Sequence, residues 1–90
     1  MNDVVIVAAA RTPVGRFGGV FKNAGALDLT IPVMQALLER SGIEAAIIDD
    51  VIWGCNYQKT FREHNLARVA AVKAGFPVTV PGITINRNCT

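Results

Sequence analysis

Short apolar runs alternate along the chain with two segments that have the periodicity of a helix. The runs cover residues 4–9, 51–53 and 83–86, and the first is a continuous series of valine, isoleucine and alanine. Continuous apolar runs of this kind are typical of strands that are covered on both faces, as in parallel sheets. Over residues 27–41 and 66–74, apolar side chains recur every three or four positions, which predicts two helices that each turn one face toward a core.

The start of the first helix allows two interpretations. Thr30 is a candidate N-cap, since Pro32 would then lie in the first turn, where a proline needs no N–H. If the helix starts nearer Leu27, Pro32 lies inside it and should bend it. In either case Gly42 is expected to end the helix.

The second helix and the segments beside it have clearer limits. Asn65 is expected to cap this helix and Gly75 to end it, with Pro77 just beyond. Residues 44–50 predict a short helical turn. Residues 55–64 are polar and irregular, which predicts a loop.

The elements follow the order β-α-β-α-β, which predicts an α/β fold. Successive strands lie about 30 to 45 residues apart, a spacing that favours right-handed crossovers and a mainly parallel sheet with helices on its faces. Three strands and two helices would leave an edge and a face of the sheet open. The last predicted strand is also followed at once by the final residues. We therefore expect residues 1–90 to form the first part of a larger α/β layer, incomplete without further polypeptide.

The composition excludes several classes of protein. Half of the 90 residues (51%) are hydrophobic and 18% are charged, which is a globular balance and not that of a disordered chain. The net charge of +2 is too small and too scattered to indicate nucleic acid or a membrane surface as a partner. No apolar run approaches the ~20 residues of a membrane-spanning helix, and the amino terminus lacks the basic region of a signal peptide. A cytoplasmic location is therefore expected.

The chain has two cysteines and one histidine, which limits its chemistry. Two cysteines are too few for a disulfide scaffold, and a structural zinc site needs four ligands, usually in closely spaced pairs. We expect no bound metal. Catalysis would then depend on a cysteine, on charged side chains, or on groups outside this sequence.

Cys89 is the strongest candidate for a reactive side chain. It follows the carboxyl end of a predicted parallel strand, where open α/β sheets place their ligand sites. A helix starting at Cys89 would put the sulfur at a positive dipole end, which favours the thiolate, and would make the Cys89 backbone N–H an oxyanion donor. A small buried cysteine without chemistry is the alternative at this stage.

Other candidates are weaker. Cys55 follows the second predicted strand without a helix start, so a packing role is expected. His64 lies in a polar loop before a helix cap, where a solvated or capping side chain is commoner than a base. Arg11 and Arg16 lie in a glycine-rich loop that could meet an anion, but the loop matches no phosphate-binding motif. Arginines paired with carboxylates are the simpler expectation there.

Three segments, taken together, point to a known family. They are VVIVAAARTPVGRFGG over residues 4–19, NLAR over residues 65–68 with an alanine-rich continuation, and TINRNC over residues 84–89. In this order they resemble the thiolases, the acetyl-CoA acetyltransferase family, over the whole chain. The last segment is similar to the one that contains the family's nucleophilic cysteine. The resemblance therefore implies that Cys89 is a nucleophile.

The resemblance also implies a reaction. The Cys89 thiolate would attack an acyl-CoA thioester and form an acyl-enzyme, which a carbanion of acetyl-CoA then attacks to give a 3-ketoacyl-CoA. Thiolysis of a 3-ketoacyl-CoA is the reverse direction. No cofactor is implied beyond the coenzyme A thioester, which is a substrate. Ping-pong kinetics would follow.

The resemblance finally implies partners. The family's histidine base, second cysteine, asparagine and coenzyme A-binding loop domain all lie downstream of its nucleophile, so the remainder of a thiolase polypeptide is expected, in a homodimer or homotetramer. The segment 55–64 departs from the family because it has no glycine, which affects the expected subunit contacts. Two alternatives stay open, namely a condensing enzyme of the ketoacyl-synthase type and a non-catalytic thiolase-like subunit.

Overall fold

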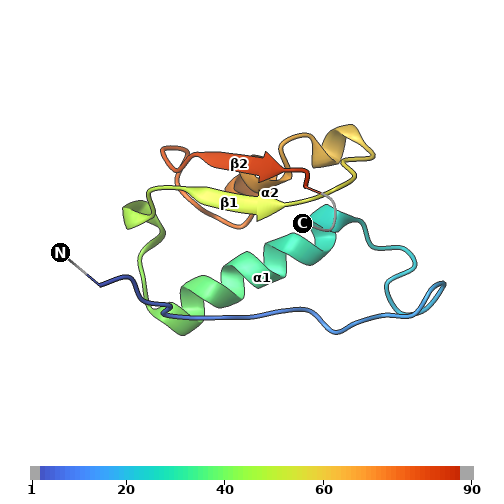
Figure 1. Ribbon diagram of the computed structural model, residues 1–90, viewed down its shortest axis with the longest axis horizontal. Coiled ribbons are helices and arrows are strands. Elements are labelled where there is room, and N and C mark those ends of the chain that lie inside the picture. Colours follow the sequence, from blue (N-terminus) through green and yellow to red (C-terminus); the bar gives the residue numbers. More distant parts are fainter. Residues whose placement is uncertain (1–2, 88–90) are drawn as a thin grey trace.

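Two helices cover one side of a small parallel sheet. The computed structural model describes residues 3–87 of the chain. The helices and strands, labelled in Figure 1, are α1 (Ala26–Ser41), β1 (Val51–Gly54), α2 (Leu66–Lys73) and β2 (Gly82–Ile85). Two short 3₁₀ turns, Ala45–Ile47 and Phe61–Glu63, lie before β1 and before α2. Each predicted helix and the last two predicted strands therefore form close to their expected positions.

The two strands run parallel and pair over their whole length. Their register places Val51 opposite Gly82 and Trp53 opposite Thr84. Beyond the strand ends, the backbone N–H of Cys55 donates to the carbonyl oxygen of Ile85 at 2.9 Å. Helix α2 connects the strands and packs against both of them. The predicted α/β class and parallel pairing are confirmed.

The strand predicted over residues 4–9 is not formed. This segment is extended but lies outside the sheet, whose described strands are β1 and β2 (Figure 1). Val4 and Ile6 are 99% and 91% exposed. The prediction is wrong because an apolar pattern indicates that a segment is to be buried, whereas a strand also needs a neighbouring strand for its backbone N–H and C=O groups.

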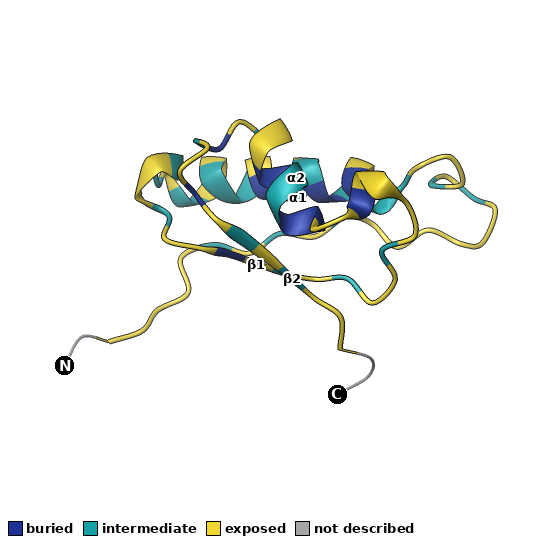
Figure 2. Cartoon of the chain, turned by 90° about the horizontal axis from the view of Figure 1, so that it is seen from above, coloured by how far each residue is buried: buried dark blue, intermediate teal, exposed yellow. Residues whose placement is uncertain are grey.

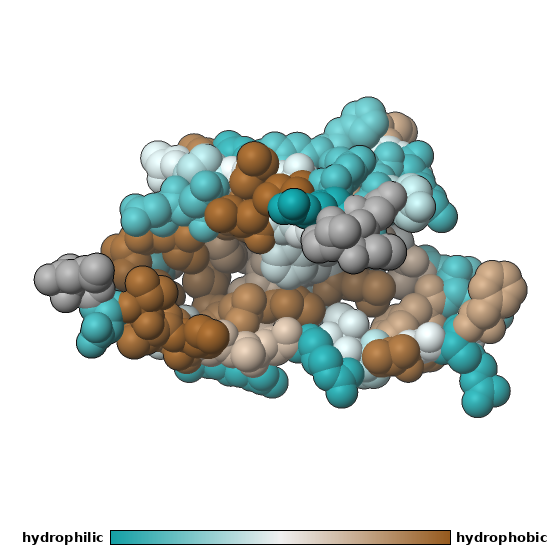
Figure 3. Space-filling view, in the orientation of Figure 1, coloured by the Kyte–Doolittle hydropathy of each residue, from teal (hydrophilic) through white to brown (hydrophobic). Residues whose placement is uncertain are grey.

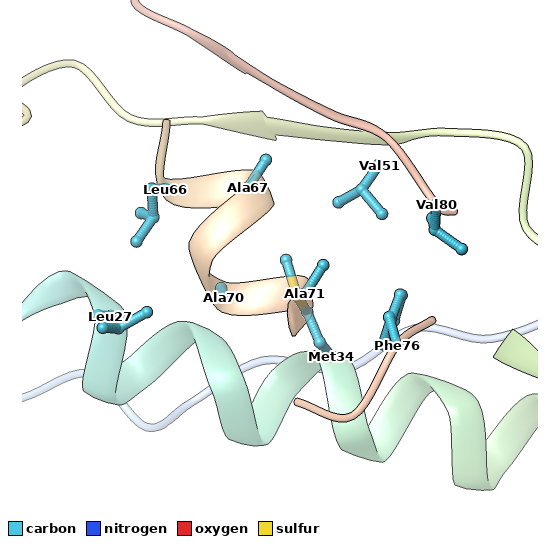
Figure 4. Close-up of a cluster of buried hydrophobic side chains, with 9 residues drawn as sticks. All are labelled: Leu27, Met34, Val51, Leu66, Ala67, Ala70, Ala71, Phe76 and Val80. Carbon is cyan, nitrogen blue, oxygen red and sulfur yellow. The ribbon is translucent and has the colours of Figure 1, made fainter. Parts of the chain in front are cut away.

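The core lies between the helices and the sheet. In Figure 4 the three alanines of α2 lie between the sheet and α1, so their small side chains allow close packing of these elements. Leu27, Leu66 and Val80 are the largest side chains that are fully buried. The buried hydrophobic residues are Leu27, Met34, Val51, Leu66, Ala67, Ala70, Ala71, Phe76 and Val80.

The other face of the sheet is uncovered in the part of the chain that the structure describes. Ile52, Ile83 and Ile85 are 63%, 50% and 42% exposed, and they alternate with residues that face the helices. Figure 2 shows both helices on one side of β1 and β2. Successive strand residues point to opposite faces, so these isoleucines form one apolar surface. The expected open face is confirmed.

Helix α1 begins four residues before the predicted cap Thr30. Gly25 occupies the N-cap position, and its backbone N–H donates to Asp28 Oδ2 at 2.9 Å. The Ala26 N–H donates to Glu63 Oε1 at 3.3 Å. Thr30 lies inside the helix, where its hydroxyl donates to the Ala26 carbonyl oxygen at 2.7 Å. Of the two interpretations, the start near Leu27 with Pro32 inside the helix is confirmed. The capping role of Thr30 is wrong, because carboxylates from positions 28 and 63 satisfy the first N–H groups instead.

The helix ends as predicted. Gly42 adopts a left-handed backbone with φ of 69°, and its N–H donates to the Leu38 carbonyl oxygen at 3.0 Å. Gly75, just after α2, has φ of 97°. Both positions use a conformation that glycine adopts without a steric penalty.

Asp28 gives the chain an acid-sensitive helix start. The N–H of Gly25, and secondarily the charge of Arg62, hold the pKa of Asp28 below its usual 3.8, although desolvation opposes them. Because the pKa of Asp28 is lower in the folded state, the ionised carboxylate stabilises the fold above pH 3.8. This contribution is lost as the pH falls below 3.8 and through the pKa of the folded state. We expect Asp28→Asn to unfold at a lower temperature than wild type at neutral pH. The two proteins should converge in strong acid, as measured by circular dichroism, and a difference independent of pH would contradict this.

Candidate functional site

The candidate nucleophile Cys89 lies outside the described residues 3–87. The structure does describe the strand that leads to it, since β2 ends at Ile85, four residues earlier in the sequence. Because β1 and β2 are parallel, their carboxyl ends meet at one edge of the sheet, where Gly54 lies opposite Ile85 (Figure 1). The sequence that follows β2 thus leaves the sheet at the edge where α/β folds bind ligands.

Cys55 lies at this same edge but is held as a structural residue. It is partly buried and packs against the core cluster. Its thiol donates to the Tyr57 carbonyl oxygen at 3.6 Å. This agrees with the packing role predicted for Cys55.

His64 is exposed at the end of the 3₁₀ turn before α2. Its backbone N–H donates to the Phe61 carbonyl oxygen at 3.3 Å. The side chain is open to solvent, as expected for a histidine in a polar loop. The backbone of His64 therefore closes the turn that precedes Asn65, and its side chain makes none of the described hydrogen bonds.

The glycine-rich loop after residue 10 is fixed by backbone contacts. Arg11 is exposed, and its guanidinium donates to the Thr12 carbonyl oxygen at 3.0 Å. The Gly19 N–H donates to the Arg16 carbonyl oxygen at 2.9 Å, which closes a turn. A carbonyl thus takes the place of the carboxylate expected beside Arg11. Arg16 contributes to this turn through its backbone.

A pair of polar side chains, Asn65 and Thr84, connects α2 to β2 by contacts that the sequence did not predict. Asn65 precedes α2 with a left-handed φ of 45°, and its Nδ2 donates to the Gly82 carbonyl oxygen at 3.0 Å. The Thr84 hydroxyl donates to Asn65 Oδ1 at 2.9 Å and accepts from the Ala67 N–H at 2.9 Å. Asn65 therefore occupies the predicted N-cap position, but the side chain that caps the helix is that of Thr84. No local spacing reveals this, since Thr84 lies 17 residues after Ala67.

Glu63 was also missed by the sequence analysis. Its side chain is 9% exposed, and Oε2 accepts from the Lys59 N–H at 2.8 Å while Oε1 accepts from Ala26. The carboxylate thus joins the loop over residues 55–64 to the positive end of α1. The loop is ordered by a buried side chain within it and not by glycines.

An apolar cleft of about 300 Å³ separates the amino-terminal segment from the helices and sheet. Val7 and Ala8 line one side, and side chains of α1 and β1 line the other, with only Ser41 and Asp50 polar. Figure 3 shows a hollow with brown, hydrophobic side chains around it. Such a lining suits packing, and its two polar side chains are engaged with the backbone, Ser41 with the Leu38 carbonyl oxygen and Asp50 with the Val51 N–H.

Residues 3–87 contain neither a candidate metal cluster nor a membrane-spanning helix. No cluster of three or more histidine, cysteine, aspartate or glutamate side chains is placed to hold a metal ion there. Within the same residues, no helix is both long and apolar enough to cross a bilayer.

Comparison with known proteins extends this picture to the whole chain. Residues 4–90 match the family model described as "Thiolase, N-terminal domain". The chain is 50% identical to a 3-ketoacyl-CoA thiolase of Pseudoalteromonas translucida, with 99% of the chain and 23% of that protein aligned. It is 48% identical to the 3-ketoacyl-CoA thiolase of Escherichia coli strain K12, with 99% of the chain and 24% of that protein aligned.

A solved structure agrees with these relatives. The acetyl-CoA acetyltransferase of Bacillus anthracis superimposes with a TM-score of 0.81 and 46% identity, over 90% of this chain and 20% of that one. The chain thus spans about a quarter of the length of its curated relatives, 23% and 24% in the two cases above. A family match over residues 4–90, with a shared α/β arrangement, identifies the chain as a member of the thiolase family.

Proposed function

We propose that this chain supplies the nucleophile Cys89 of an acyl-CoA acyltransferase. The observation that supports this most directly is the parallel pairing of β2 with β1, because it directs the sequence after Ile85 to the carboxyl edge of the sheet. The family match extends over residue 89, and the relatives are thiolases and an acetyl-CoA acetyltransferase by name. Of the two cysteines, Cys55 is engaged in packing.

The proposed reaction has two half-reactions. In the first, the Cys89 thiolate attacks the thioester carbon of acetyl-CoA, the bond from that carbon to the coenzyme A sulfur breaks, and coenzyme A leaves as a thiolate that takes up a proton. The Cys89 backbone N–H is proposed to donate to the oxyanion of the tetrahedral intermediate. In the second, acetyl-CoA loses an α-proton, its carbanion attacks the acyl-enzyme, and acetoacetyl-CoA forms as the Cys89 sulfur is released.

Cysteine suits this chemistry because sulfur is both a good nucleophile and a good leaving group. The bond broken and the bond formed in the first step are both thioesters, so the exchange is nearly balanced in energy. The same intermediate therefore serves condensation and thiolysis of a 3-ketoacyl-CoA. The names of the relatives favour the thiolytic direction, and the acetyl-CoA specificity is part of the proposal.

The proposed enzyme needs more than these residues. The histidine of this chain, His64, is exposed in its loop, and we assign the proton transfers to groups of further polypeptide. We propose that the chain acts together with the remainder of a thiolase polypeptide, in a homodimer or homotetramer. Coenzyme A thioesters are substrates in this scheme, and no other cofactor takes part.

Mass spectrometry after incubation with acetyl-CoA tests the proposal. The polypeptide that contains this chain should acquire one acetyl group, and digestion should locate it on Cys89. The variant Cys55→Ser is the matched control and should be acetylated to the same extent, because the sulfur of Cys55 packs against the core and meets the Tyr57 carbonyl oxygen. A folded protein that acquires no acetyl group would favour a non-catalytic thiolase-like subunit, and an acetyl group on Cys55 would show that the nucleophile is the other cysteine.

A further inference from the structure

The link between α2 and β2 is built from specific contacts and not from general packing. Thr84 Oγ1 uses both its hydrogen-bonding capacities, donating to Asn65 Oδ1 and accepting from the Ala67 N–H, each at 2.9 Å. Asn65 adds a second connection through Gly82 at 3.0 Å. A side chain of β2 thus satisfies an N–H of the first turn of α2, which its own sequence leaves without a cap.

Two more contacts hold the same turn against the start of β2. Arg68 Nη1 donates to the Val80 carbonyl oxygen at 2.7 Å. A Cβ added at Gly82 would lie 2.9 Å from the Arg68 backbone nitrogen, so the two backbones approach more closely than any larger residue would allow. The position of β2 relative to α2 is therefore fixed at Val80, Gly82 and Thr84.

Thr84 is the last of these contacts before the candidate nucleophile, five residues ahead of Cys89 in the sequence. Ile85 is still paired, through the Cys55 N–H. The backbone hydrogen bonds between β1 and β2 fix the separation of the two strands. The hydroxyl of Thr84, through its contact with the Ala67 N–H, also fixes how the end of β2 is inclined toward α2. Any change of inclination would therefore begin at Thr84, before the sequence that leads to Cys89.

We propose that Thr84 is a positioning residue for acyl transfer, because its hydroxyl, held between Asn65 and Ala67, orients the end of β2 and so sets where the Cys89 sulfur meets the thioester. This inference rests on the proposed role of Cys89 as the nucleophile. Thr84 itself touches no reacting atom. Its effect should be on the rate of acylation and not on the affinity for acetyl-CoA, since the alignment of nucleophile and carbonyl is what changes.

The pair Thr84→Val and Thr84→Ser separates the hydroxyl from the shape of the side chain. Both variants are made in the polypeptide that contains this chain, and the acetylation of Cys89 is followed after rapid mixing with acetyl-CoA. We expect Thr84→Val to acylate about tenfold more slowly at saturating acetyl-CoA, because small misplacements of reacting atoms have large effects on rate. The concentration that gives the half-maximal rate should be unchanged. Thr84→Ser should keep the wild-type rate constant.

A merely structural role gives a different result. It would reduce the fraction of protein that becomes acetylated, while the protein that does react would keep the wild-type rate constant. That outcome, or a Thr84→Ser variant as slow as Thr84→Val, overturns the proposal. If Thr84→Val does not fold, Asn65→Gly replaces it, because glycine accepts the φ of 45° and removes one partner of the hydroxyl. This variant should also acylate more slowly, and a wild-type rate overturns the proposal.

The same measurement distinguishes this inference from the function on which it rests. If wild-type protein is never acetylated on Cys89, the proposed function fails and the positioning role fails with it. If wild type is acetylated and Thr84→Val reacts at the same rate constant, only the positioning role fails.

Discussion

Replacing Cys89 with alanine is expected to lower the rate of acyl transfer at least about 10⁴-fold, because loss of a covalent nucleophile removes the acyl-enzyme route altogether. The loss should appear in kcat for both condensation and thiolysis, since both directions share the acyl-enzyme. Binding of coenzyme A thioesters should persist, because alanine removes a sulfur and leaves the surrounding site in place. Steady-state kinetics in both directions, with a direct binding measurement, check this result.

Cys55→Ala is the control for this experiment. Cys55 lies at the same carboxyl edge of the sheet, and its thiol contacts the Tyr57 carbonyl oxygen and the core cluster. Turnover by this variant should remain close to wild type. If Cys55→Ala loses as much activity as Cys89→Ala, or if Cys89→Ala retains turnover, the nucleophile has been assigned to the wrong residue.

The second large effect is expected at Gly82, where alanine should destabilise the fold by about 2 kcal/mol, a typical cost of overpacking. The added Cβ would lie 2.9 Å from the nitrogen and 3.2 Å from the Cα of Arg68, and 3.1 Å from the carbonyl carbon of Ala67. All three atoms belong to the backbone of α2, so the clash is relieved only if the helix moves away from β2. Such a movement would also stretch the hydrogen bonds of Thr84. Urea unfolding of both proteins measures the difference.

Gly54→Ala provides a matched comparison. Gly54 ends β1 as Gly82 begins β2, but a Cβ at Gly54 would meet nothing within 4 Å. We expect this variant to be as stable as wild type, since alanine loses less backbone freedom on folding than glycine does. Equal destabilisation by the two substitutions would show that the close approach of α2 and β2 is not what makes Gly82 necessary.

The sequence predicts those parts of the fold that depend on local patterns. The periodicity of Leu27, Met34 and Leu38 identifies α1, and the glycines at 42 and 75 mark where the two helices end. The predicted order of the last four elements is confirmed by the structure. For the segment over residues 4–9 a local pattern is not sufficient. Its apolar side chains predict that it is buried in a complete fold, but they do not identify the element that covers it.

The candidate site was predictable only in part for a related physical reason. Cys89 can be proposed from the sequence because its place after a strand and its motif are both local features. Thr84 and Glu63 were not found, because each acts on a helix start that is distant in the chain, at Ala67 and Ala26. When a side chain caps a helix that is distant in the sequence, the number of residues between the two is not fixed, so no sequence motif reveals the contact. The choice between a start at Thr30 and one nearer Leu27 stayed open for the same reason, since the partners of the α1 N–H groups include one from position 63.

The open isoleucine face described above affects how such a protein is made. Ile52, Ile83 and Ile85 stay in water until something covers them, and Val4 and Ile6 share this exposure. In a polypeptide as long as the relatives, each further hundred residues takes about 5 to 20 s to synthesise, and these side chains stay exposed until a covering element is made. A chaperone that binds nascent chains would therefore meet a folded segment whose sheet has one exposed apolar face. Binding to that face during translation would protect the segment from aggregating with other copies.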